Sequence, residues 1–313
     1  MTPSFDMLWA GFLYAVAIPA AFAAAGLLLA RRWSESRRDS TTSTTTTSTS
    51  VGPEPLPPSW LRTIAEGLTI TAAMIAGWDG LARTGQLGWD YLRPTDAATW
   101  LPALAIGLTW AGVIERLIMR PSWARWAWRV VIAVAAAWML RRAESTIQPT
   151  AIGWVGGLAA AILGLWGTLD SASRRWPGFA LPVLAACAGT AAAAVLMLAG
   201  IAKFATMAAL PIGVLVGCAC AELRRPGGRA IDAAIPMFAV IAPGLLFAGY
   251  FNTYSQVPWG AFLSALAGPL ALGLGAALAP GRRSRWVAAV VALAVMALAV
   301  GSAIAAEWPF TEE

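Results

Sequence analysis

The side chains best suited to bind a solute are gathered between residues 231 and 260, together with one acid earlier in the chain. The candidate binding residues are Asp232, Pro243, Gly244, Tyr250, Asn252, Tyr254 and Glu66. Apolar residues surround Asp232, Pro243 and Gly244, a polar string follows over residues 250–256, and the stretch is long enough for a membrane helix. A proline-glycine pair inside such a helix frees backbone carbonyls, which the broken helices of transporters use to bind substrate. Proline is also ordinary in membrane helices, so a purely structural bend is the competing interpretation.

Helical geometry places several of these residues on one side of the stretch. At about 100° per residue, one stripe carries Asp232, Pro236, Ala239, Pro243, Tyr250 and Tyr254. We expect this stripe to face protein, because irregular backbone at membrane depth must be satisfied by neighbouring helices.

Glu66 is the acid that lies deepest in an apolar run. Arg62 precedes it by one helical turn, so a local ion pair is the first interpretation. A titrating site that couples transport to protons is the second. Other acids, such as Glu115 and Glu222, lie beside arginines near the ends of apolar runs. This shortage of charge at mid-depth favours a membrane component, or a carrier of neutral or apolar solutes, over ion-coupled transport.

The sequence lacks the residues that metal sites, cofactor sites and many catalytic sites require. The chain has no histidine, and its three cysteines, Cys187, Cys218 and Cys220, form no metal-binding motif. We therefore expect no metal, no cofactor and no catalytic residues. Acids in the segment 79–97, at Asp79, Asp90 and Asp96, could imitate a membrane-embedded transferase, although helix and turn capping also explains them.

The elements that position these residues are membrane helices. The 313 residues are 58% hydrophobic and only 12% charged, with a mean hydropathy of +0.66, and apolar runs of about twenty residues recur along the chain. The sequence predicts an all-α integral membrane protein, a polytopic bundle of about ten transmembrane helices. The expected spans are 7–30, 60–78, 98–119, 130–140, 150–169, two within 177–223 that divide near 200–203, 231–251, 259–279 and 286–306.

The basic residues set the orientation. With the N-terminus and the C-terminus both extracytoplasmic, most of the 22 lysines and arginines fall on the cytoplasmic side, as the positive-inside rule requires. The net charge of +6 is thus explained by topology, and we expect no nucleic-acid partner. The expected location is the inner (cytoplasmic) membrane.

The chain divides into four parts. Residues 1–33 form the first membrane helix, 34–59 a disordered Ser/Thr/Pro-rich cytoplasmic linker, 60–306 a nine-helix bundle and 307–313 an acidic extracytoplasmic tail. Rows of small residues that let helices approach closely are Gly153-Gly157-Ala161, Gly156-Ala160-Gly164, Gly213-Gly217 and Ser264-Gly268.

The function expected from these features is that of a non-catalytic, multi-pass membrane component. The alternative is a transporter or permease for a small neutral or apolar substrate that uses the helix over 231–251, and the third is the transferase. The expected partners are the lipid bilayer and other membrane proteins or further copies of this chain.

Overall fold

The computed structural model describes residues 5–42, 59–85, 97–119, 121–141, 151–176, 178–224, 229–253, 255–278 and 282–307, and within these ranges it contains helices, turns and no strand. In chain order the elements are α1 (Phe5–Phe12), the π-helical turn η1 (Leu13–Ala17), α2 (Ile18–Thr42), α3 (Ser59–Arg83), α4 (Ala97–Ile118), α5 (Ser122–Arg141), α6 (Ala151–Arg175), α7 (Ala180–Leu198), α8 (Ala202–Arg224), the 3₁₀ turn η3 (Ala230–Ala233), α9 (Ile235–Asn252), α10 (Trp259–Leu278) and α11 (Arg282–Glu307). The all-α prediction is therefore confirmed.

The protein is a multi-pass membrane protein. Among the described residues, six helices are long and apolar enough to cross a membrane: Trp9–Arg32, Gly153–Arg175, Ala180–Leu198, Ala202–Arg224, Ile235–Asn252 and Trp286–Glu307. The apolar part of α10 is shorter, Trp259–Gly275. Helices α3, α4 and α5, with 25, 22 and 20 residues, are similar in length to these but are not among the six. Within the described residues, most expected spans fall on one long helix, whereas the span 7–30 covers α1, η1 and the start of α2, and the span 231–251 begins in η3.

Two predicted boundaries are informative. The long apolar stretch divides at Gly200, where the chain adopts a φ of +77° between α7 and α8. Glycine adopts this conformation without steric cost, which explains the position of the break. The short span expected over 130–140 lies within a longer helix, since α5 runs from Ser122 to Arg141, and Arg129 within it is paired inside the protein.

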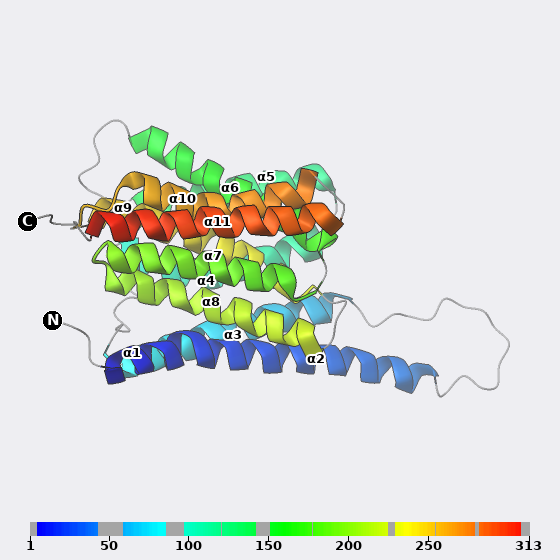
Figure 1. Ribbon diagram of the computed structural model, residues 1–313. Helices are drawn as coiled ribbons and strands as arrows, with labels where there is room; N and C mark the ends of the chain where they lie inside the picture. Colours follow the sequence, from blue (N-terminus) through cyan, green and yellow to red (C-terminus); the bar gives the residue numbers. More distant parts are fainter. Residues whose placement is uncertain are drawn as a thin grey trace, which may run out of the picture.

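The end of the first long helix differs from the prediction, and the predicted tail after the last helix lies mostly outside the described residues. Helix α2 continues to Thr42, past the expected end of the first span and into the segment 34–59 assigned to a linker. Residues 43–58, which make up the rest of that segment, and 308–313 of the acidic tail lie outside the described residues. The start of α1 and the end of α11 lie at the same end of the bundle (Figure 1), as an even number of crossings requires.

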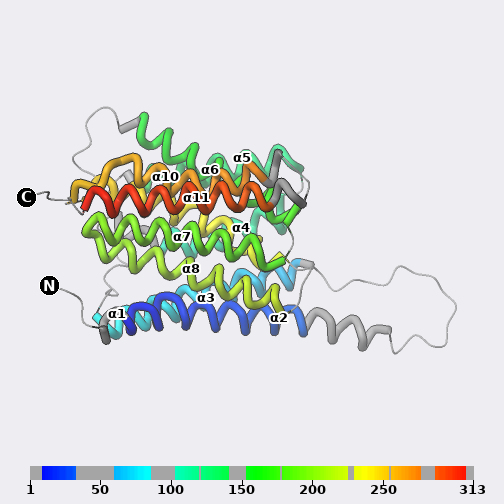
Figure 2. The backbone as a smooth tube through the Cα atoms, in the orientation of Figure 1, coloured from blue at the N-terminus to red at the C-terminus, as the bar shows by residue number. Residues whose placement is uncertain are grey.

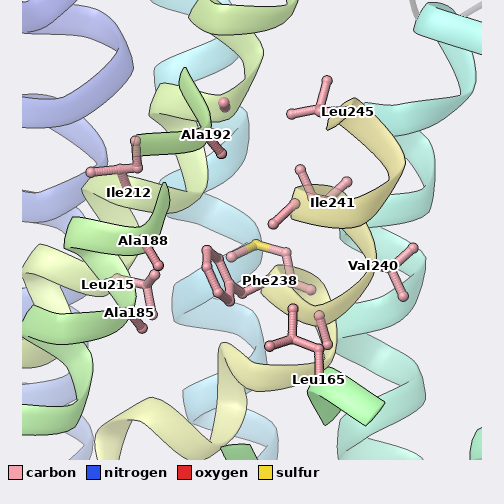
Figure 3. Close-up of a cluster of buried hydrophobic side chains, with 14 of the residues drawn as sticks. Leu165, Ala185, Ala188, Ala192, Ile212, Leu215, Phe238, Val240, Ile241 and Leu245 are labelled. Carbon is pink, nitrogen blue, oxygen red and sulfur yellow. The ribbon is translucent and has the colours of Figure 1, made fainter. Parts of the chain in front are cut away.

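Helices α7 and α8 lie between α2 on one side and α10 and α11 on the other (Figure 2). Helix α9 runs through the middle of the molecule and contacts α4, α6, α7, α8 and α10. Phe238 of α9 points toward Ala185 and Ala188 of α7, and Val240 points away from them to the opposite side of α9 (Figure 3). Since side chains on all sides of α9 are apolar and buried, this helix is the core of the bundle.

Glycine allows the first helix to pack closely on α8. A Cβ on Gly213 would lie 2.6 Å from the carbonyl oxygen of Val16, and one on Gly217 would lie 2.5 Å from that of Ala20. The predicted small row in α8 is therefore confirmed as a helix-packing surface. On α6 the prediction is wrong for Gly153, because no neighbouring atom lies within 4 Å of a Cβ built there.

The open surroundings of Gly153 have a simple cause. The first turns of α6 lie at the edge of the bundle (Figure 1), and the surroundings of Gly156 and Gly157 are equally open. The later glycines of α6 do pack: a Cβ on Gly164 would meet Leu270 at 3.4 Å. Only the second half of α6 therefore uses its glycines for packing within the described part of the chain.

A buried ion pair joins the same two helices that the glycines bring together. Arg31 of α2 donates a short hydrogen bond to Oε1 of Glu222 in α8, and the side chains are only 6% and 1% exposed. The backbone N–H of Ala230 donates to the same carboxylate oxygen at 2.7 Å. Glu222 of α8 therefore links its own helix to α2 and to the turn η3.

Candidate functional site

A polar pocket of about 250 Å³ opens at the end of the bundle opposite to the start of α1. It lies where α4 and α6 end, α5 begins and η3 leads into α9. Its charged lining consists of Arg116, Arg125, Arg129, Arg174, Arg229, Glu115, Asp170 and Asp232. Its apolar lining consists of Gly112, Trp166, Ile235 and Pro236. Five arginines thus face three carboxylates, and the pocket carries an excess of positive charge when all of them are ionised.

Arg129 organises the pocket. Its Nε donates to Oε1 of Glu115 at 2.9 Å, and its Nη2 donates to Oδ2 of Asp170 at 3.0 Å. The guanidinium carbon lies 5.5 Å from the ring centroids of both Trp126 and Trp166. Arg129 is buried and its charge is matched on two sides, so it joins α4, α5 and α6 and is poorly placed to bind a further anion.

A close helix contact fixes the inner wall. A Cβ on Gly112 would lie 2.4 Å from Cγ of Pro236, so only glycine allows α4 to approach the start of α9 this closely.

Asp170 also accepts from Nη2 of Arg174, one turn later on α6, at 3.0 Å. Two of the three acids are therefore paired with arginines of the pocket.

The remaining arginines have weaker partners. Arg125 donates from Nε to the backbone carbonyl of Met119 at 2.8 Å, and Arg116 approaches Glu66 only to 3.6 Å. Arg229 is exposed at the rim. Among the described residues, the structure records no carboxylate in salt-bridge contact with Arg125 or Arg229. Both guanidinium groups therefore have donors left for an incoming anion.

Asp232 is the acid whose charge is least supported. Its Oδ1 is buried and accepts no hydrogen bond in the structure. Burial raises the pKa of Asp232, and the negative charge of Asp170 adds to the rise, whereas Arg116, Ser173 and Arg229 lower it. Asp232 therefore takes up a proton more readily than an exposed aspartate, and the pocket becomes more positive when it does.

Two of the residues expected to form a site lie at this pocket or next to it. Asp232 lines it, and so does Pro236 of the same helical stripe. Glu66 is buried behind Arg116, and the expected ion pair with Arg62 is confirmed at 2.9 Å. The sequence singled out both acids but did not indicate that arginines from other helices surround them.

The other candidates lie further along α9. Pro243 and Gly244 are buried in its middle, and α9 is continuous from Ile235 to Asn252, which favours the structural bend over the broken helix of the two interpretations. Packing on all sides holds this helix in shape, so the backbone hydrogen bond that proline cannot make does not interrupt it. The cavity beside α9, between α7 and α8, has a volume of about 10 Å³ and is too small for a solute.

The polar residues at the far end of α9 have structural contacts. Tyr250 packs against the rings of Trp154, Phe251 and Phe262. Asn252 donates from Nδ2 to the carbonyl of Ala248 at 2.8 Å. Tyr254 lies outside the described residues. The structure thus does not gather the expected site residues in one place: Asp232 and Glu66 lie near the pocket, and the other described candidates lie in the core or at the opposite end.

The sequence carries a signal for the missed residues. Arg125 and Arg129 are one helical turn apart on α5, and so are Asp170 and Arg174 on α6. Such pairs inside apolar helices indicate a buried polar surface. From the sequence alone topology is a sufficient explanation for them, because arginines at helix ends satisfy the positive-inside rule equally well.

No protein-family model, curated protein or solved structure matches this chain. Within the described residues, no group of three or more histidine, cysteine, aspartate or glutamate side chains is placed to hold a metal ion. The fold and the pocket therefore define a class: an all-helical, multi-pass membrane protein with an arginine-rich polar pocket at one end of its bundle.

Proposed function

We propose that the protein is a non-catalytic component of the inner membrane that binds an anionic ligand in the arginine-rich pocket at its cytoplasmic end. The observation that carries the proposal is the set of five arginines facing three carboxylates in a pocket of about 250 Å³. The planar guanidinium group matches the geometry of phosphate and carboxylate oxygens. Arg125 and Arg229, which have no recorded carboxylate contact among the described residues, are the proposed anion-binding residues.

The proposed orientation rests on charge. The pocket's arginines lie at the end of the bundle that the positive-inside rule assigns to the cytoplasm. We propose ten crossings, one for each long helix, with both termini outside. The common position of the start of α1 and the end of α11 supports this count (Figure 1).

Anion binding to the purified protein tests the proposal. Inorganic pyrophosphate is the probe, and titration calorimetry in nanodiscs is the measurement. We expect binding that weakens at least about tenfold in Arg125→Ala and in Arg229→Ala, since each removes a charge-assisted hydrogen bond. Arg83→Ala is the matched control, because Arg83 is exposed on α3 at the opposite end and pairs with Asp79. Absence of binding, or an equal loss in the control, would refute the proposal.

The transporter alternative depends on a water-accessible path beside α9. Ala239 and Ala248 are 0% and 3% exposed, so we expect a water-borne thiol reagent to reach neither Ala239→Cys nor Ala248→Cys. Reaction at Ala239→Cys alone would favour the transporter. For the transferase alternative, Asp79 is paired with Arg83 at 2.7 Å, and Asp90 and Asp96 lie outside the described residues.

A further inference from the structure

A second cavity lies on the same pair of helices as the polar pocket. It is an apolar groove of about 290 Å³ between α4 and α5. On α4 the groove extends to Ala111 and the pocket begins at Gly112. On α5 the pocket includes Arg129 and the groove begins at Ile132. The two cavities therefore follow one another along a single seam.

Trp128 marks the boundary between them. Its indole Nε1 donates to the carbonyl of Ala111 across the seam at 3.1 Å. On the pocket side of this contact the lining is charged, and on the groove side it is made of alanine, leucine, isoleucine, methionine and glycine. A ligand that used both cavities would need an anionic head and an apolar tail.

Exposed tryptophans indicate the depth of the boundary. Trp123 and Trp126, on the first turns of α5, are 73% and 51% exposed, and Val131 and Val134 on the following turns are exposed apolar residues. Tryptophan concentrates at the membrane–water interface. The pocket is thereby placed at the depth of the lipid headgroups, and the groove extends into the hydrocarbon.

The groove has a suitable length and is kept open. From Ala103 to Ala111 the helix rises roughly 12 Å at 1.5 Å per residue. Gly107 lies in its middle, and no atom lies within 4 Å of a Cβ built there. Basic pockets between membrane helices on the cytoplasmic side are known binding sites for anionic lipid headgroups.

From these observations we infer that the ligand is an anionic phospholipid, with its phosphate headgroup in the arginine pocket and one acyl chain in the α4–α5 groove. This inference rests on the proposed function and names the class of its ligand. Arg125 and Arg229 hold the phosphate, and Gly107 and Ala135 leave room for the chain.

Lipid binding to groove variants tests the inference. The purified protein is titrated with dioleoyl phosphatidic acid and, separately, with dioleoyl phosphatidylcholine, and bound lipid is counted by native mass spectrometry. The groove variant is Gly107→Leu, with Ala135→Leu as a second. The matched control is Gly301→Leu, since Gly301 is exposed on α11 and a Cβ built on it also meets no atom within 4 Å.

We expect both groove variants to weaken phosphatidic acid binding at least about tenfold, because the added side chain displaces several methylenes from the groove. Pyrophosphate should bind these variants like the wild type, which shows that they are folded, and the control should bind both ligands normally. The inference is overturned if the groove variants bind phosphatidic acid like the wild type, or if phosphatidylcholine binds as tightly as phosphatidic acid. In either case, pyrophosphate binding to the wild type would still support the proposed function. If the wild type does not bind pyrophosphate, the proposed function itself is refuted.

Discussion

The ion pair between Arg31 and Glu222 is the contact whose loss should damage the fold most. In Glu222→Ala, the guanidinium of Arg31 stays buried at the interface of α2 and α8 without the carboxylate that now faces it. The backbone N–H of Ala230 loses its acceptor as well. Breaking a buried pair by removing one partner costs about 3–5 kcal/mol, because the remaining charge loses the carboxylate that stabilised it. The corresponding fall in melting temperature is on the order of 10 °C.

The assay is thermal unfolding in detergent, followed by the intrinsic fluorescence of the 17 tryptophans. Asp79→Ala is the control, since it removes an ion pair whose arginine is 76% exposed, and exposed pairs contribute less than about 1 kcal/mol. The double variant Arg31→Met/Glu222→Leu removes both charges and keeps the side chains large and apolar. We expect it to be more stable than Glu222→Ala, because no buried charge is left behind and only the acceptor of the Ala230 N–H is missing.

Two results would refute this reasoning. A Glu222→Ala variant that melts within about 1 °C of the wild type would show that Arg31 finds enough compensation elsewhere. A double variant that melts as low as the single one would show that the side chains contribute through a specific contact and not through the balance of buried charge.

Three further predictions concern packing, protonation and orientation. Gly217→Leu should destabilise the protein by about 1–3 kcal/mol or more, because the new side chain would clash with the backbone of α2. Gly156→Leu should change the melting temperature little, because a Cβ built there meets no atom within 4 Å. Equal effects of the two variants would contradict this packing of α2 on α8. Because the pKa of Asp232 is raised, its carboxyl group becomes neutral at a higher pH than an exposed aspartate, so Asp232→Asn should bind pyrophosphate more tightly than the wild type when Asp232 is ionised, and the two should converge as pH falls. A difference that stays constant with pH would exclude Asp232 as the group responsible. In a background without the native cysteines, Thr84→Cys should react with an impermeant reagent from outside intact cells and Arg224→Cys only after permeabilisation, and the reverse pattern would invert the proposed orientation.

Much of the fold could be predicted because span length is a strong constraint. Apolar runs of about twenty residues locate the helices, and Gly200 locates the division between α7 and α8. The Gly213–Gly217 row also indicated a close helix contact, since small residues in membrane helices serve mainly that purpose. The same rule failed for Gly153, because a pattern within one helix does not say whether a partner helix is present.

The pocket could not be predicted in the same way. It joins residues from four separate segments, and its central contacts link Arg129 to Glu115 and to Asp170, which are 14 and 41 residues away. Their meeting depends on how α4, α5 and α6 pack, and apolar periodicity fixes that packing only loosely. The two interpretations of Pro243 stayed open for a related reason: whether a proline breaks its helix depends on the neighbours that surround it.

The long interval between Arg31 and Glu222 has a consequence for biosynthesis. The two residues are 191 positions apart, and a ribosome that adds about 5–20 residues per second needs roughly 10–40 s to make the segment between them. The first helix is therefore inserted well before the helix that supplies its carboxylate exists. During that time Arg31 must keep its charge at the water-facing edge of the bilayer, which its place near the end of the first span allows. Assembly of the bundle around α8 would then be the step that draws this arginine inward, and a chain truncated before Glu222 should leave the first helix inserted but undocked.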